Sequence, residues 1–327
     1  MNQRRTFLTT LVAGLAAASR AAPAQQMPKV GWLQLSSKGM YAELTSRGFL
    51  KGLREAGYEE GRNIQILHRA AEHDLRKLRA LARDLVAQKV DVIFAPAKPM
   101  ADAAWYASRA VPTVIATVTD PVLVEYAVSL ARPGKHITGV TTASGELIGK
   151  RIQLLAEMVP GLKRLGTLID PDLLDSCTEE VELMEKAARK LGLSLERVPV
   201  RLDNLDLETA IRTALAGKVQ ALITAPMTSN QDFTDKVAEA SARHRLPFMH
   251  DVPQLAASAL AVYGPDTEDI FRRAAHYVAR ILKGEKPAAM AIEEPREFRL
   301  IVNRRVARQL GLTLSQAVLL RADEVIE

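Results

Sequence analysis

Residues 117–139 read T-V-T-D-P-V-L-V-E-Y-A-V-S-L-A-R-P-G-K-H-I-T-G and mark a change in the organisation of the chain. The stretch begins as the end of an apolar run, Thr113–Val118, that is typical of a buried strand. The turn Thr119-Asp120-Pro121 follows, then a short helical pattern, the breaker Arg132-Pro133-Gly134 and a second strand over Ile137–Thr141. Open α/β sheets bind ligands at the carboxyl ends of their strands. We therefore expect this stretch to hold part of a binding site and the first crossing between two lobes.

Upstream of this stretch, short apolar runs alternate with amphipathic ones. The apolar runs predict strands over Val30–Leu35, Ile64–Leu67 and Val90–Ala95. The segments between them, Tyr41–Ala56 and His73–Gln88, carry apolar residues at helical spacing. Strands that alternate with helices in this way indicate a parallel, doubly wound sheet.

The same arrangement restarts downstream with a helix over Leu147–Val159. Further strands are predicted at Leu165–Ile169, Leu195–Val200, Ala221–Ala225, Pro247–His250 and Phe298–Val302, and further helices at Glu179–Leu191, Leu207–Ala216, Asp232–His244 and Glu268–Lys283. We predict an α/β fold of two doubly wound parallel-sheet lobes joined by a multi-strand hinge. The first lobe takes residues 28–141 plus 251–295, and the second takes 142–250 plus 296–327, where the assignment of the tail is left open.

The first 24 residues have the pattern of a cleavable signal peptide. Arg4 and Arg5 give a basic start, Leu8–Ala18 is a short apolar run, and Ala22-Pro23-Ala24 has the small residues that a signal peptidase requires. The run is too short to cross a bilayer as a helix. We expect export to the periplasm by the Sec or the twin-arginine route, since Arg-Arg-x-Phe-Leu is compatible with both. A disordered soluble tail is the alternative.

Net charge, aromatic content and the cysteine count limit the kind of partner and of chemistry that we expect. The formal charge of +6 becomes +3 when residues 1–24 are removed, because 41 basic and 38 acidic residues remain. That balance and an aromatic content of 5% argue against nucleic acid as a partner. The single cysteine, Cys177, has no catalytic signature around it, and its pattern favours a half-buried residue at a helix start.

The chain carries no recognisable enzyme motif. A G-x-G-x-x-G after the first strand, a Walker loop and a G-x-S-x-G elbow are all missing, and the 6 histidines are scattered without metal-ligand spacing. His250 and Asp251 are the most plausible acid–base pair, but neighbouring residues on a strand point to opposite faces. We predict no catalytic residue, no metal and no cofactor.

Polar loops follow the predicted strands and supply the candidate binding residues. Carboxyl ends of strands and the helix amino termini beyond them suit a carboxylate or another small polar group. For any single loop, a helix cap or turn remains the simpler explanation. The candidates are Ser36, Ser37, Lys98, Thr119, Asp120, Asp170, Thr228, Ser229 and Asp251.

An ordered set of short motifs resembles one family across nearly the whole chain beyond residue 24. These motifs are Phe49-Leu50-Lys51-Gly52-Leu53-Arg54-Glu55-Ala56-Gly57-Tyr58, Glu60-Gly61-Arg62-Asn63, Val90-Asp91-Val92-Ile93, Asp120-Pro121-Val122, Ser129-Leu130-Ala131-Arg132-Pro133-Gly134, Thr138-Gly139-Val140, Lys150-Arg151, Pro160-Gly161, Tyr263-Gly264, Ile281-Leu282-Lys283-Gly284 and Asn303. The chain resembles the substrate-binding proteins of ABC importers, in the group that includes the tryptophan/tyrosine-type binding proteins.

The resemblance implies a type I periplasmic-binding-protein fold with three hinge strands and a ligand in the interlobe cleft. It matches Ser36, Lys98, Thr119 and Asp120 to the first-lobe loops that hold the polar head of the ligand. It places Asp170, Thr228, Ser229 and Asp251 on the second-lobe side. Family members often carry small residues after the third strand, where this chain has the loop Ala97-Lys98-Pro99. Lys98 suits an anionic ligand if it faces the cleft and is otherwise a solvated surface lysine.

We therefore expect an exported, monomeric, non-enzymatic receptor. It would bind a small polar organic ligand, an amino acid or an aromatic or other carboxylic acid, and deliver it to an ABC permease in the inner membrane. A ligand-sensing module for a signalling partner is the alternative. An enzyme on the same scaffold is disfavoured by the missing motifs, and a repressor by the export signal at the amino terminus.

Overall fold

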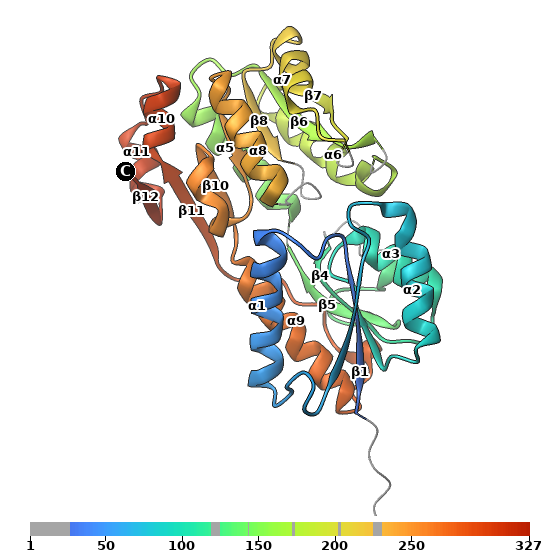
Figure 1. Ribbon diagram of the computed structural model, residues 1–327. Helices are drawn as coiled ribbons and strands as arrows, with labels where there is room; N and C mark the ends of the chain where they lie inside the picture. Colours follow the sequence, from blue (N-terminus) through green and yellow to red (C-terminus); the bar gives the residue numbers. More distant parts are fainter. Residues whose placement is uncertain (1–26, 119–124, 143, 172–173, 202–203, 225–230) are drawn as a thin grey trace, which may run out of the picture.

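The computed structural model describes residues 27–118, 125–142, 144–171, 174–201, 204–224 and 231–327. Within these residues the chain forms two α/β lobes, each built around its own sheet (Figure 1). The predicted signal peptide lies outside the described part of the chain. No helix in the described ranges is both long and apolar enough to cross a bilayer.

The first lobe contains a parallel sheet of five described strands in the order β2-β1-β3-β4-β5. Successive residues of β1 point to opposite faces: Trp32 packs with α1 and α9, and Leu33 packs with α2 and α3. Helices therefore cover both faces of the sheet. The elements are β1 (Lys29–Gln34), α1 (Met40–Glu55), β2 (Gln65–Ala70), α2 (Leu78–Ala87), β3 (Val92–Phe94), α3 (Lys98–Ala107), β4 (Thr113–Val118), β5 (Ile137–Thr141) and α9 (Thr267–Leu282), with single 3₁₀ turns at Leu75–Lys77 and Pro287–Ala289.

The second lobe contains a sheet of seven described strands in the order β12-β11-β10-β9-β8-β6-β7. All neighbouring strands run parallel except β10 and β11. Helices α5, α6, α10 and α11 pack on one face of the sheet, and α7 and α8 on the other. The elements are α5 (Ser144–Met158), β6 (Arg164–Ile169), α6 (Leu174–Lys190), β7 (Ser194–Pro199), α7 (Leu207–Ala216), β8 (Ala221–Thr224), α8 (Gln231–Arg243), β9 (Phe248–His250), a 3₁₀ segment over Pro253–Ser258, β10 (Ala261–Pro265), β11 (Phe298–Asn303), α10 (Arg304–Leu310), α11 (Gln316–Arg321) and β12 (Glu324–Ile326).

Two parts of the sequence behave differently from the expectation. The predicted first-lobe segment 251–295 is divided between the lobes in the structure, because β10 pairs in the second sheet while α9 packs on the first. The predicted loop Ala97-Lys98-Pro99 is in fact the start of a helix, because Lys98 opens α3 and Pro99 occupies its first turn. Proline is tolerated there because the first-turn N–H groups have no partner within the helix.

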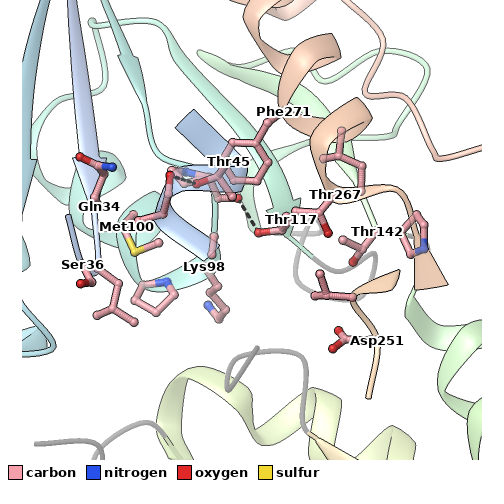
Figure 2. A pocket seen from close by; sticks show the side chains of 18 of the residues that line it. Gln34, Ser36, Thr45, Lys98, Met100, Thr117, Thr142, Asp251, Thr267 and Phe271 are labelled. Carbon is pink, nitrogen blue, oxygen red and sulfur yellow. Dashed lines mark hydrogen bonds between the residues drawn. The ribbon is translucent and has the colours of Figure 1, made fainter. Parts of the chain in front are cut away.

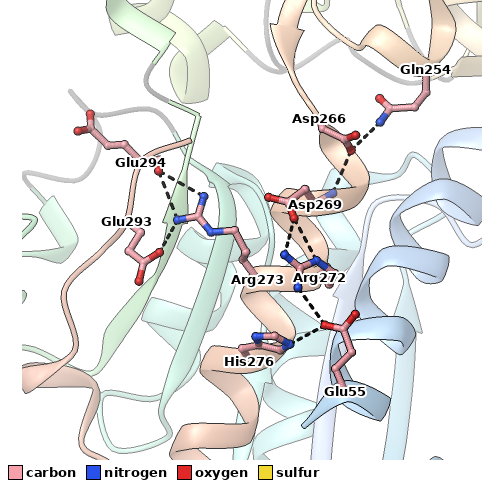
Figure 3. A network of polar contacts seen from close by, with 9 residues as sticks. All are labelled: Glu55, Gln254, Asp266, Asp269, Arg272, Arg273, His276, Glu293 and Glu294. Atoms are coloured by element: carbon pink, nitrogen blue, oxygen red, sulfur yellow. Dashed lines mark hydrogen bonds and ion pairs between the residues drawn. The ribbon is translucent and has the colours of Figure 1, made fainter. Parts of the chain in front are cut away.

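Close packing of α1 against α9 holds the first lobe together. The two helices approach so closely that a Cβ on Gly48 would lie 2.4 Å from the carbonyl oxygen of Glu268, and one on Gly52 would lie 2.2 Å from that of Arg272. Glycine is therefore required at both positions. Figure 3 shows the polar edge of this contact, where Arg272 and His276 of α9 both reach Glu55 of α1, at 2.9 and 3.0 Å.

The chain crosses between the two sheets at three places. It passes from β5 into α5, from β10 into α9, and from the turn at Pro287–Ala289 into β11. The first and third passes lie side by side: the Glu293 N–H donates to the Gly139 carbonyl oxygen at 3.0 Å, and the Thr141 N–H donates to the Glu293 carbonyl oxygen at 2.8 Å. These bonds join the passes into a narrow hinge.

Arg273 fastens this hinge to α9 (Figure 3). Its guanidinium donates to the Glu293 carboxylate, and to the Glu294 carbonyl oxygen at 3.3 Å. Burial alone raises the pKa of Glu293, but hydrogen bonds from Arg273 and Tyr277 outweigh it and hold that pKa below its ordinary value of 4.5. The ion pair therefore contributes stability above pH 4.5 and loses it as the pH falls through the lowered pKa.

Replacing Gly52 with alanine tests the helix contact. We expect Gly52→Ala to lower the free energy of unfolding by about 2 kcal/mol or more, because the methyl group meets rigid backbone. Gly149→Ala is the matched control, since Gly149 also lies within a helix and has no atom within 4 Å of its Cβ position. It should raise stability by about 0.5–1 kcal/mol. Urea denaturation measures both, and equal effects from the two changes would contradict the packing argument.

The hinge bond predicts a difference between two arginines of α9. Arg273→Met should lower the free energy of unfolding by about 1–2 kcal/mol at pH 7, since it removes charge-assisted bonds from a side chain that is only 17% exposed. Arg280→Met removes an ion pair to Glu285 from a side chain that is 43% exposed, and should change stability by less than about 0.5 kcal/mol. The loss of unfolding free energy in Arg273→Met, relative to the parent protein, should become smaller below pH 4.5. Denaturation at a series of pH values measures it. A deficit that is independent of pH would exclude the pair as its cause.

Candidate functional site

A pocket lies between the lobes and is lined from both of them (Figure 2). It encloses about 1280 Å³, including the open solvent at its mouth. The first-lobe lining comes from the ends of β1 and β4, the start of α3, α1 and the first turns of α9. The second-lobe lining comes from α5, α6 and the segments that follow β5 and β9. The lining residues include Trp32, Gln34, Ser36, Thr45, Lys98, Met100, Thr117, Thr142, Arg151, Glu180, Asp251, Val252, Ile270 and Phe271.

Aromatic rings form the first-lobe wall of the pocket. Phe49 and Phe94 stack with centroids 4.3 Å apart, Trp32 lies 4.6 Å from Phe49, and Phe271 meets Phe94 edge-on at 5.6 Å. Trp32 and Phe271 are the members of this group that also line the pocket. The Trp32 indole N–H is buried and has no hydrogen-bond acceptor within the described residues. The wall is therefore apolar and carries an unused donor.

Lys98 lines the same wall, where acidic groups balance its charge. Its ammonium group lies 3.2 Å from an Asp102 carboxylate oxygen and 3.5 Å from Glu125. The Tyr126 hydroxyl also donates to Asp102. Burial, followed by that hydrogen bond, raises the pKa of Tyr126 above its ordinary value, so the phenol stays protonated. The positive charge of Lys98 is thus already paired with carboxylates of the protein.

The floor between β3 and β4 is fixed by backbone hydrogen bonds. The carbonyl oxygen of Pro96 accepts the N–H of Ala116 at 3.0 Å, the N–H of Thr117 at 2.7 Å and the Thr117 hydroxyl at 3.2 Å. These bonds join the carboxyl end of β4 to the segment that leads from β3 into α3. The next residues along the chain, 119–124, lie outside the described part of the structure.

Asp251 reaches the pocket from the second lobe, on the far side from Gln34 and Ser36 (Figure 2). It directly follows β9, and Gly264 of β10 packs against its backbone so closely that a Cβ there would lie 1.8 Å from the Asp251 carbonyl oxygen. The Thr224 hydroxyl donates to its carboxylate at 3.5 Å. The adjacent His250 is fully buried, and its Nδ1 accepts the Val252 N–H at 2.9 Å. That imidazole nitrogen is occupied by the backbone, which leaves it unsuited to proton transfer in the pocket.

Arg151 is a pocket residue that the loop-based prediction missed. It lies on α5 together with Ile148, Ile152 and Leu155, all of them buried, at the spacing of one helix face. A charged residue on the apolar face of an amphipathic helix is the sequence signal that identifies it. Lys150-Arg151 is one of the family-like motifs, but the candidates predicted from the sequence all come from loops, whereas Arg151 lies within α5.

The predicted site residues separate into three groups. Ser36, Lys98 and Asp251 line the pocket. Ser37 and Asp170 are described but are not among its lining residues: the Ser37 hydroxyl donates to Glu72 at 2.6 Å, and Asp170 is buried just beyond β6. Thr119, Asp120, Thr228 and Ser229 lie outside the described residues, so their part in the site stays a prediction.

Comparison with known proteins agrees with this geometry. A domain protein from Vibrio cholerae has the same fold at a TM-score of 0.80, with 27% identity over 92% of this chain and 100% of its own. A Streptococcus pneumoniae ABC domain solved in complex with L-Trp gives a TM-score of 0.79, with 26% identity over 91% of this chain and 99% of its own. A tyrosine-binding protein of Clostridioides difficile is 26% identical over 81% of this chain and 76% of its own.

These likenesses confirm the predicted two-lobed α/β architecture as that of type I periplasmic binding proteins. The family of ABC transporter substrate binding proteins matches residues 33–326, which is nearly the whole of the described chain. The family resemblance found in the sequence is confirmed as well. The chain therefore belongs to the ABC transporter substrate-binding protein family.

Proposed function

We propose that this protein is an exported receptor that captures an amino acid or an aromatic or other carboxylic acid and delivers it to an ABC permease. The observation that carries the proposal is the two-sided pocket. Aromatic rings form its first-lobe wall, and the charged residues Arg151, Glu180 and Asp251 line it from the second lobe. A ligand with one flat apolar part and one charged part fits between these walls.

The names of relatives support this ligand class. The Streptococcus pneumoniae structure contains L-Trp, and the Clostridioides difficile relative is a tyrosine-binding protein. Both ligands combine an aromatic ring with a carboxylate and an ammonium group. In this chain the ring would lie against Trp32 and Phe271, and the charged groups would face the second lobe.

Capture proceeds by hinge closure, with no bond made or broken. Residues on both sides of the pocket touch the ligand only when the lobes approach, so the ligand stabilises the closed form by its contacts with the second wall. The paired passes at Gly139, Thr141 and Glu293 supply the axis for that motion. The permease would recognise the closed arrangement of the two lobes.

Export and partners follow from the same assignment. Residues 1–24 would direct the chain to the periplasm and be removed there. The mature receptor would act as a monomer beside an inner-membrane permease. A strain that lacks the gene should fail to accumulate the ligand, whereas a sensory module would leave uptake unchanged and alter a transcriptional response.

We expect ligand binding to stabilise the purified protein. A thermal-shift screen against amino acids, aromatic acids and small carboxylates should give at least one hit. At one hundred times its dissociation constant a ligand adds about 2.7 kcal/mol, a shift of several degrees. Mass spectrometry should recover the compound unchanged. A chemically altered product would support an enzyme instead, and failure of every compound, together with the absence of any co-purified small molecule, would contradict the receptor assignment.

Tryptophan fluorescence should report where the ligand binds. Of the two tryptophans, Trp32 lines the pocket, whereas Trp105 stacks on His136 in the first lobe, with centroids 4.8 Å apart. A bound ligand should change the emission of Trp105→Phe as it does that of the parent protein. It should leave the emission of Trp32→Phe nearly unchanged. A ligand response that is lost in Trp105→Phe and kept in Trp32→Phe would place binding elsewhere.

A further inference from the structure

Arg151 is one of three charged residues that line the pocket from the second lobe, and its surroundings indicate which ligand group it binds. The side chain is only 3% exposed, yet it lines the interlobe pocket. Its Nε and Nη1 groups are buried and have no hydrogen-bond acceptor in the part of the chain that the structure describes. Arg151 forms an ion pair with Asp251, whose Oδ2 lies 3.9 Å from Nη1. That separation allows electrostatic attraction but is too long for a hydrogen bond.

Such an arrangement is unfavourable without a ligand. Burial lowers the pKa of Arg151, and the charges of Asp251 and Glu180 oppose that effect. Attraction from the two carboxylates keeps the guanidinium charged, but it does not use the buried Nε and Nη1 donors. Leaving donors of a charged group buried without acceptors is costly. An acceptor that enters with a ligand would remove the cost.

The other cations of the pocket differ from Arg151. Lys98 has Asp102 and Glu125 within 3.5 Å, and Lys38 is exposed to solvent. Neither of them leaves a buried donor unused among the described residues. On the opposite wall, the Trp32 indole N–H is a second buried donor without an acceptor. Donors left over on both sides of a pocket indicate a ligand that brings acceptor atoms.

We propose that Arg151 binds a carboxylate of the ligand and makes that carboxylate a requirement for tight binding. The inference rests on the proposed receptor function and assigns the carboxylate of its ligand to one residue of the pocket. A guanidinium presents its donors as a planar fork that matches the two oxygens of a carboxylate. An α-ammonium group of an amino acid would then lie near Asp251. Amides, amines and neutral polyols of the same size cannot replace the carboxylate.

The position of Arg151 also links the carboxylate to closure. Arg151 belongs to the second lobe, whereas the ring of the ligand lies against the first. A ligand that carries both groups ties the two walls together, and one that lacks the carboxylate touches the first wall alone. The carboxylate should therefore promote closure as well as affinity.

The experiment compares matched acids and amides by isothermal titration calorimetry. The pairs are L-tryptophan with L-tryptophanamide, L-tyrosine with L-tyrosinamide, and 4-hydroxybenzoate with 4-hydroxybenzamide. We expect the parent protein to prefer at least one acid over its amide by about 30-fold or more. Arg151→Met should abolish this preference and leave the affinity for the amide within about 3-fold of the parent value.

Three variants make the comparison specific. Arg151→Lys keeps the positive charge but lacks the planar fork of donors, and it should bind the acid about 10-fold more weakly than the parent protein. If circular dichroism shows that Arg151→Met is unfolded, Arg151→Lys takes its place in the comparison. Lys98→Met should weaken acid binding less than Arg151→Met, because Asp102 and Glu125 already balance Lys98. Arg164→Met removes a half-exposed arginine outside the pocket and should change nothing. X-ray scattering should show compaction with the acid and none with the amide.

Each outcome decides the inference separately from the receptor function. Equal binding of acid and amide by the parent protein, or an acid preference that survives in Arg151→Met and Arg151→Lys, overturns the role of Arg151 and leaves the receptor intact. If no compound of the panel binds, the small molecule that co-purifies is identified. If that co-purified molecule has no carboxylate, the inference is overturned. If it has one, its binding to the parent protein and to the same variants is measured in place of the panel acid. Absence of any bound or co-purified compound refutes the receptor function itself.

Discussion

The close approach of α1 to α9 is the contact on which the rest of the structure depends. Gly48 and Gly52 let the helix backbones meet where any larger residue would meet a carbonyl group. In the sequence, α9 comes after β10 of the second sheet. The first lobe therefore obtains the helix that completes its core only after the chain has passed through most of the second lobe. Because α9 must return to pack against α1, the chain has to cross the hinge more than once.

The same contact shapes the pocket. Phe271 of α9 joins Trp32, Phe49 and Phe94 in one aromatic cluster, so the helix that closes the core also completes the first wall. Arg273, two residues further along α9, holds the hinge through Glu293. Core, wall and hinge are thus built on one helix. In the proposed closure, the lobes would move about the hinge that Arg273 of α9 holds through Glu293.

Electrostatics distinguish the two sides of the pocket. On the first lobe Lys98 is neutralised by Asp102 and Glu125 before any ligand arrives. On the second lobe Arg151 is attracted by Asp251 without a hydrogen bond to it. From the sequence, Lys98 suits an anionic ligand only if it faces the cleft, with a solvated surface lysine as the alternative. In the structure Lys98 lines the pocket and is already paired with two acids. The buried donors without an acceptor belong instead to Arg151 on α5.

Periodicity in the sequence was sufficient to predict the two-lobed α/β fold, because alternating strands and amphipathic helices have few ways to bury their apolar faces. It also placed Ser36, Lys98 and Asp251 just beyond the carboxyl ends of strands, which share one edge of a sheet, and these three residues line the interlobe pocket. It could not assign β10 and α9 to different lobes, because which sheet a strand joins depends on hydrogen bonds to residues distant in sequence. Nor could it find the pairing of Lys98 or the unused donors of Arg151. Charge balance at a site is decided by which side chains the tertiary structure brings within a few ångströms, and the order of residues along the chain does not record those distances.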